Sequence, residues 1–249
     1  MATANQTFIF FVFFTITSSL CLAIDPSPLQ DFCVADLTSQ VLVNGFTCKN
    51  PKTVKAKDFF LSGFNKPGNT MNPLGINLTP ATVAQLPGLN TLGLSLVRID
   101  YAPGGVNPPH THPRASEIIV VLEGTLYAGF VTSSPNDILY SKVLSAGDVF
   151  VFPQGLTHFS MNYGYSNAVA LVALNSQKPG RIIAANNVFG SKPLISDDLL
   201  AKAFQLSKET VDKLQGKHWP ANNVLFGSKP LISDVLLTKA YIPGEHEHC

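Results

Sequence analysis

The sequence predicts an all-β domain, a β-barrel or β-sandwich, followed by a C-terminal helical arm. Short apolar segments recur between Gly, Pro, Asn and Asp turns from residue 92 to residue 174, which is typical of barrel or sandwich strands. After Pro179 the spacing of the apolar residues becomes that of a helix. The 249 residues fit one domain of the larger all-β kind or two small ones.

Six segments of this region are the expected strands. They cover residues 92–101, 117–122, 125–131, 141–144, 149–152 and 168–174. The segment 117–122 is apolar on both faces, and such strands are usually covered on both sides. We therefore expect the barrel core on one side and a second sheet or another subunit on the other.

The C-terminal arm is predicted to be one helix. Ser196, Asp197 and Asp198 can cap a helix that runs from about Leu199 towards Lys217. Beyond it, the segment 185–197 is repeated at 221–234 with one inserted residue, which is too few copies for a repeat architecture. We assign residues 24–220 to the domain and 221–249 to a duplicated tail without function. The His- and Glu-containing end of that tail favours only adventitious metal binding.

The N-terminus predicts a signal peptide over residues 1–23. Phe8 to Phe14 is almost entirely apolar, and the small residues Cys21 and Ala23 suit cleavage after Ala23. The alternative is a membrane anchor, but a spanning helix needs about 20 apolar residues and the Thr/Ser stretch dilutes this run. The mature protein is therefore expected to be secreted, with no membrane partner after cleavage.

Secretion changes the interpretation of the cysteines and of one Asn. Cys33 and Cys48 lie close in sequence and, in an oxidising compartment, favour a disulfide; the alternative is two reduced core thiols. Asn77 begins an Asn-x-Thr glycosylation motif in what the flanking prolines indicate is a loop. Both predictions depend on export.

The charge content excludes one class of partner and favours another. A formal net charge of +1 gives no electrostatic basis for nucleic-acid binding. Only 13% of the residues are charged, below the roughly 25% of an average soluble domain. Because a soluble chain with so few charges often buries surface against copies of itself, we expect a homo-oligomer.

A cluster of metal-binding residue types stands in the middle of the chain. His110 and His112 are two apart and on a strand would face the same side, and Glu117 opens the next strand on its inward parity. A Pro-Gln-Gly turn then delivers His158 at the start of another strand. Three imidazoles and one carboxylate suit Mn(II) or Fe(II) better than a structural zinc site. The alternative is that the histidines are ordinary core or surface residues.

Two motifs containing these residues make the sequence similar to germins and germin-like proteins of the cupin superfamily. The first cupin box is matched by Gly104, His110, His112, Glu117 and Gly124. The second is matched by Gly147, Pro153, Gly155, His158 and Asn162. The resemblance implies a cupin jelly-roll β-barrel, a homohexamer built from dimers, bound Mn(II) and a location in the apoplast or cell wall. It also implies the Cys33–Cys48 disulfide.

The same resemblance implies an activity but leaves alternatives open. Superoxide dismutase activity is the leading hypothesis, with Asn107 as the catalytic residue that orients the ligand or a water. Oxalate oxidases resemble this chain at Asn107 but carry Asn where this chain has Val97, and Val cannot hydrogen-bond a dicarboxylate. The remaining alternative is a non-enzymatic wall or reserve protein that binds a ligand.

Overall fold

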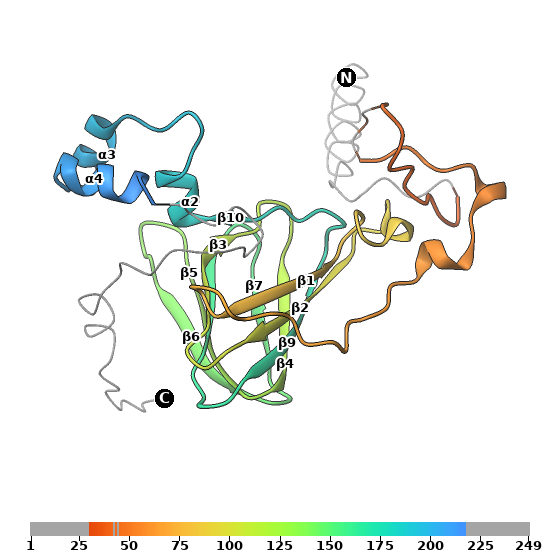
Figure 1. Cartoon of the computed structure of the whole chain (residues 1–249), viewed down its shortest axis with the longest axis horizontal. Helices are drawn as coiled ribbons and strands as arrows, with labels where there is room; N and C mark the ends of the chain where they lie inside the picture. The colour runs from red at the N-terminus through yellow and green to blue at the C-terminus, as the bar shows by residue number, and fades with distance from the viewer. Residues whose placement is uncertain (1–29, 42, 44, 218–249) are drawn as a thin grey trace, which may run out of the picture.

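Two five-stranded antiparallel sheets form the barrel of this protein (Figure 1). A computed structural model describes residues 30–41, 43 and 45–217. The expected signal peptide (1–23) and duplicated tail (221–249) lie outside these residues. The strands are β1 Ile76–Ala81, β2 Ser95–Tyr101, β3 Val106–Thr111, β4 Glu117–Glu123, β5 Thr125–Val131, β6 Leu139–Ser145, β7 Val149–Phe152, β8 Thr157–Asn162, β9 Ala168–Leu174 and β10 Ile182–Ile183.

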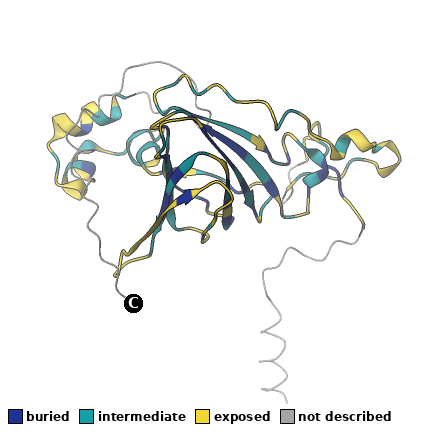
Figure 2. Ribbon diagram, turned by 90° about the horizontal axis from the view of Figure 1, so that it is seen from below, coloured by how far each residue is buried: buried dark blue, intermediate teal, exposed yellow. Residues whose placement is uncertain are grey.

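The two sheets face each other, and their inner faces form the core. One sheet has the order β1-β2-β9-β4-β7 and the other the order β10-β3-β8-β5-β6. Alternation along β4 buries Ile119 and Val121, which are fully inaccessible to solvent. Most buried residues lie on the strands, and the helices and loops are mainly exposed (Figure 2). The prediction of an all-β barrel with a helical arm is confirmed.

The outer face of β4 is not covered by the described part of the chain. Ile118 and Leu122 are each 44% exposed, and Val149 and Val151 on the neighbouring β7 are also exposed. The predicted burial of β4 on both faces therefore holds only for the inner face of the isolated chain. Oligomerisation, which would cover the outer face, stays a prediction.

The segment around Asn77, predicted to be a loop, forms strand β1. It lies at the edge of its sheet, where Pro80 is tolerated because the missing N–H costs no ladder hydrogen bond. Asn77 is therefore in a strand, and its Nδ2 donates to Thr79 Oγ1 over 3.2 Å. A Cβ atom added to Gly68 would stand 2.0 Å from that Nδ2, so the backbone at residue 68 lies close against the amide.

The prediction of one long C-terminal helix is wrong. The arm consists of α2 Ala184–Phe189, α3 Asp197–Phe204 and α4 Lys208–Gln215. Gln205 adopts a left-handed conformation with φ of 54° and ends α3. Ser207 then caps α4, its side chain accepting from the backbone N–H of Thr210. None of the described helices has the length and apolarity needed to span a bilayer.

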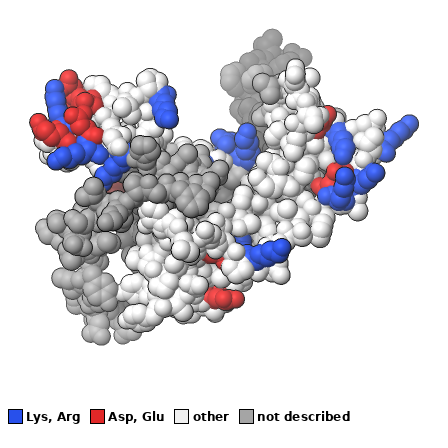
Figure 3. Space-filling view, viewed as in Figure 1, with Lys and Arg blue, Asp and Glu red and all other residues white. Residues whose placement is uncertain are grey.

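The predicted disulfide closes a loop within the N-terminal segment, and the N–H of Ala35 donates to the carbonyl oxygen of Pro87. Cys33 and Cys48 are bonded to each other, and Ala35 pairs with Cys48 in an isolated β-bridge. Three short 3₁₀-helices accompany this region: η1 Pro51–Thr53, η2 Ala56–Phe59 and η3 Pro87–Leu89. On the face seen in Figure 3, charged side chains gather on this segment and on the helical arm, and few lie on the barrel.

Candidate metal centre

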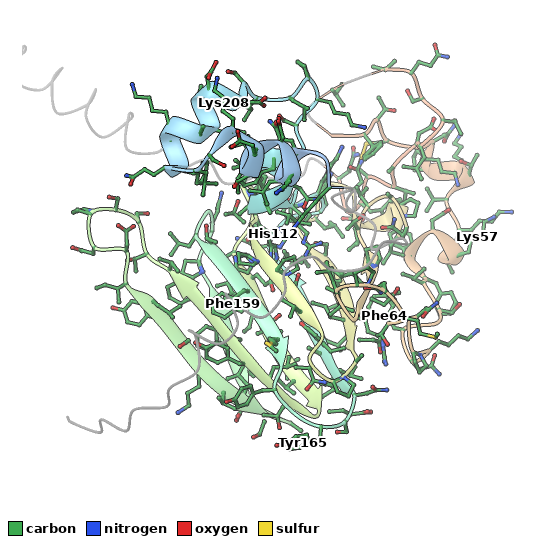
Figure 4. All side chains as sticks on the ribbon, turned by 60° about the vertical axis from the view of Figure 1, so that its left-hand side comes forward. Lys57, Phe64, His112, Phe159, Tyr165 and Lys208 are labelled. Atoms are coloured by element: carbon green, nitrogen blue, oxygen red, sulfur yellow. A yellow bond between two sulfur atoms is a disulfide. The ribbon has the colours of Figure 1, made fainter. Side chains whose placement is uncertain are left out.

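Four predicted ligands, contributed by β3 and β8 of one sheet and β4 of the other, meet inside the barrel. His110 lies in β3 and His112 just after it, Glu117 begins β4, and His158 is the second residue of β8. All four are buried, and one ligand atom from each lies within 4.8 Å of the others. His112 stands at the end of the barrel that is nearer to the helices (Figure 4).

The backbone of β3 explains how both Asn107 and His110 face the interior. Strand parity alone would place residues three apart on opposite faces. The pairing of β3 with β8 shifts register between Asn107 and His110, and Pro108 and Pro109 occupy that irregularity. As a result Asn107 is 3% exposed and His110 is 2% exposed.

Backbone carbonyl groups fix the orientation of all three imidazoles. The Nδ1 atom of His110 lies 2.8 Å from the Pro108 carbonyl oxygen, and that of His158 lies 2.9 Å from the Leu156 oxygen. The Nδ1 atom of His112 contacts the carbonyl oxygen of Gly180. A carbonyl only accepts, so each Nδ1 carries the proton and each Nε2 presents a lone pair.

These lone pairs converge on a carboxylate, an arrangement that suits a cation. Glu117 Oε2 lies 3.0 Å from His112 Nε2 and 3.4 Å from His158 Nε2. His158 Nε2 is buried and makes no hydrogen bond among the described residues. Lone pairs that face one another in a buried site repel unless a proton or a metal ion lies between them. The donor set of three nitrogens and one carboxylate therefore fits a divalent transition metal.

The electrostatics keep His110 and Glu117 in the protonation states that bind metal. Burial alone would raise the pKa of Glu117, but hydrogen bonds from His112 and His158, formed when a proton lies between the nitrogen and the carboxylate, outweigh it and lower this pKa to about 2. Burial and the nearby positive charge of Arg181 hold the pKa of His110 well below its usual value. At neutral pH the site thus offers a carboxylate and a neutral imidazole, the forms that bind metal.

A cavity of about 470 Å³ opens beside this cluster. His110, His112 and Glu117 line it, together with Asn107 and Val97, both of which the sequence had placed near the chemistry. Val97 is on the wall formed by β2, so its apolar side chain does face the site.

Arg181 is a residue of this cavity that sequence analysis missed. It precedes β10, lines the cavity, and its Nη2 donates a hydrogen bond to Asn107 Oδ1. The two residues are 74 positions apart in the sequence, and no motif links them. Only the pairing of β10 with β3 at His110 and Thr111 brings them together.

Comparison with known proteins places this site in a family. The family described as "Cupin" matches residues 62–212, more than half of the chain. Rice (Oryza sativa subsp. japonica) "Putative germin-like protein 2-1" is 58% identical over 214 residues, covering 86% of this chain and 99% of the relative. Rice "Germin-like protein 8-7" is 58% identical over 224 residues, covering 90% and 100%. This chain is a germin-like cupin.

Solved structures similar to this germin-like chain have the same barrel. A recombinant oxalate oxidase in complex with glycolate superposes with a TM-score of 0.74 at 46% identity, covering 77% of this chain and 96% of that one. Peruvianin-I, titled a cysteine peptidase from Thevetia peruviana latex, has a TM-score of 0.61 at 44% identity, covering 65% and 98%. The predicted germin-like family and cupin fold are both confirmed.

Proposed function

We propose that this germin-like chain is a manganese protein that converts superoxide into dioxygen and hydrogen peroxide. The observation that carries the proposal is the buried cluster of three oriented imidazoles and Glu117, in which His112 and His158 direct their Nε2 atoms at the carboxylate and His158 Nε2 makes no hydrogen bond among the described residues. His110, His112, Glu117 and His158 would hold the ion. A set of four protein ligands leaves positions for small ligands on a metal that prefers six.

The reaction divides into two one-electron steps. One superoxide gives up an electron and leaves as dioxygen, and a second takes up that electron and two protons and leaves as hydrogen peroxide. The bound manganese would supply the change between divalent and trivalent states that this exchange requires. Asn107 acts through its amide Nδ2, because its Oδ1 already accepts from Arg181. Nδ2 can therefore donate a hydrogen bond to an anion or to a water.

Oxalate oxidation is the second candidate, favoured by the likeness to a structure titled oxalate oxidase. Val97 argues against it, because this side chain lines the cavity and cannot donate a hydrogen bond to a dicarboxylate. Losing one such contact in a buried site costs roughly 1–3 kcal/mol.

A thiol-dependent activity has less support. Peruvianin-I is titled a cysteine peptidase, but within residues 30–41, 43 and 45–217 both cysteines belong to the Cys33–Cys48 disulfide. Neither is free to act as a nucleophile.

Location and assembly belong to the same proposal. We infer secretion to the apoplast or cell wall from the N-terminal sequence and from the disulfide, which forms in oxidising compartments. The exposed apolar outer face of β4 and β7 supports assembly into a homohexamer. Glycosylation at Asn77 remains a prediction, and a glycan there would displace the backbone near Gly68.

Metal analysis of the secreted protein, coupled to two assays, tests the proposal. We expect one manganese per chain, superoxide dismutation above that of free Mn(II), and no oxalate-dependent peroxide. His110→Ala should lose both metal and activity, whereas Thr111→Ala, on the same strand, should keep both. Peroxide release that requires oxalate would favour the oxidase instead. A manganese-loaded protein inactive in both assays would leave the non-enzymatic ligand-binding protein as the better account.

A further inference from the structure

We propose that Arg181 and Asn107 form an anion-binding subsite, which takes the carboxylate of a small organic acid with an apolar body. The subsite lies in the cavity beside the metal cluster. It does not depend on superoxide being a substrate, because the residues that form it are not metal ligands.

The first support is the state of the Arg181 guanidinium. Its Nη2 is held by Asn107 Oδ1, but its Nε is buried and makes no hydrogen bond among the described residues. A guanidinium stays charged in proteins and offers several N–H groups in one plane, which match the two oxygens of a carboxylate. A ligand carboxylate would supply the acceptor that the Nε–H lacks.

The second support is the balance of charge in the cavity. Arg181 and Lys178 are cationic and both line it, while Glu117 is its carboxylate and is already engaged by His112 and His158. A bound divalent metal would add further positive charge. A buried positive charge that lacks a full counter-charge favours binding of an anion.

The third support is the shape and chemistry of the remaining wall. The strands β1, β2 and β9 contribute an apolar surface made of Leu78, Val97, Ile99, Val172 and Leu174. The volume of about 470 Å³ falls in the range of roughly 300–1,000 Å³ typical of pockets for small organic molecules. A diatomic anion leaves most of this volume unused. A ligand with an anionic head and an apolar body would pair with the Arg181 guanidinium and also fill the space against the apolar wall.

The backbone around Arg181 holds the subsite in place relative to the metal cluster. The preceding Gly180 carbonyl orients His112, and the Pro179 carbonyl accepts from the N–H of Arg114. The next residue, Ile182, begins β10 and pairs with β3. The same short segment thus orients one metal ligand and positions the cation.

Calorimetric titration with benzoate and with benzamide tests the subsite. Benzamide has nearly the same shape but no charge, so we expect benzoate to bind about 10-fold or more tightly than benzamide. Arg181→Met should weaken benzoate binding about 10-fold or more, and Arg181→Lys should weaken it less, because it keeps the charge but loses the planar fork. Lys142→Met is the matched control: this exposed cation on β6 is not among the residues that line the cavity, and its loss should leave the affinity within about 2-fold.

Both metal-free and manganese-loaded protein are titrated, and metal content and circular dichroism are measured for every variant. Dependence on Arg181 in both forms supports the subsite. Equal affinity of Arg181→Met and the unchanged protein overturns it, as does the absence of benzoate binding at millimolar concentration. Arg181-dependent binding in a protein that does not dismutate superoxide would refute the proposed function and leave the subsite standing. A protein that dismutates superoxide but shows no Arg181-dependent benzoate binding would refute the subsite and leave the proposed function standing.

Discussion

The buried ion pair on the outer side of β2 provides a quantitative test of how the cavity wall is stabilised. Arg98 Nε lies 3.1 Å from both carboxylate oxygens of Asp100, and its Nη2 lies 2.6 Å from Oδ1. Arg98 Nη1 also donates to the carbonyl oxygen of Phe64, and Asp100 accepts from the N–H of Gly68. The pair therefore fastens the loop around Phe64, labelled in Figure 4, to the strand that carries Val97.

Replacing Arg98 with Met should lower the free energy of unfolding by about 3–5 kcal/mol. The substitution leaves the Asp100 carboxylate, in a residue only 5% exposed, with Gly68 as its remaining hydrogen-bond donor. The double variant Arg98→Met/Asp100→Leu removes the unpaired charge. It leaves the Phe64 carbonyl and the Gly68 N–H without these partners, and each loss should lower the free energy of unfolding by about 1 kcal/mol. We therefore expect the double variant to be more stable than Arg98→Met alone.

Equilibrium unfolding in urea, followed by circular dichroism, measures these differences. The control is Lys208→Met, which breaks an exposed ion pair with Asp198 and should give no resolvable change. If Arg98→Met behaves like this control, the pair does not stabilise the strand. If the double variant is less stable than the single one, the cost does not come from an unpaired buried charge.

Three further substitutions test the core, the disulfide and the metal centre. Tyr101→Phe removes the buried hydroxyl that lies 2.8 Å from Ser160 Oγ, and should cost about 1–2 kcal/mol in the same unfolding assay; no loss would mean that the contact is energetically neutral. Replacing both Cys33 and Cys48 with Ser should cost about 3 kcal/mol, because the bond closes a loop with a sequence separation of 15; unchanged stability after the exchange would contradict this. Phe152→Leu removes the ring that stacks on the His158 imidazole, with the ring centroids 4.6 Å apart. It should weaken metal binding about 10-fold in a chelator competition. An unchanged metal affinity would show that the stacking does not position His158.

The sequence by itself determined the residues that form the metal cluster. All four lie within two short segments, so strand parity and a tight turn are enough to direct them inward. The alternation along β4 likewise predicted which residues enter the core. These are local properties, because side-chain direction along a strand follows from the backbone alone.

Local signals failed where longer-range contacts decide. Pro80 made the segment around Asn77 read as a loop, and only its position at a sheet edge permits the strand. The apolar spacing of the arm predicted a continuous helix, but the backbone turns at Gln205 and α3 ends there. Whether a strand lies at a sheet edge and where a helix ends both depend on which distant segments pack against them.

Only the tertiary structure assigned Arg181 to the cavity. No spacing rule connects it to Asn107, 74 residues earlier, and β10, which brings them together, has only two residues. The same is true of the Gly180 carbonyl that orients His112. The local sequence determines which residues are metal ligands. The groups that orient these ligands and line the cavity come from distant segments that strand pairing brings together.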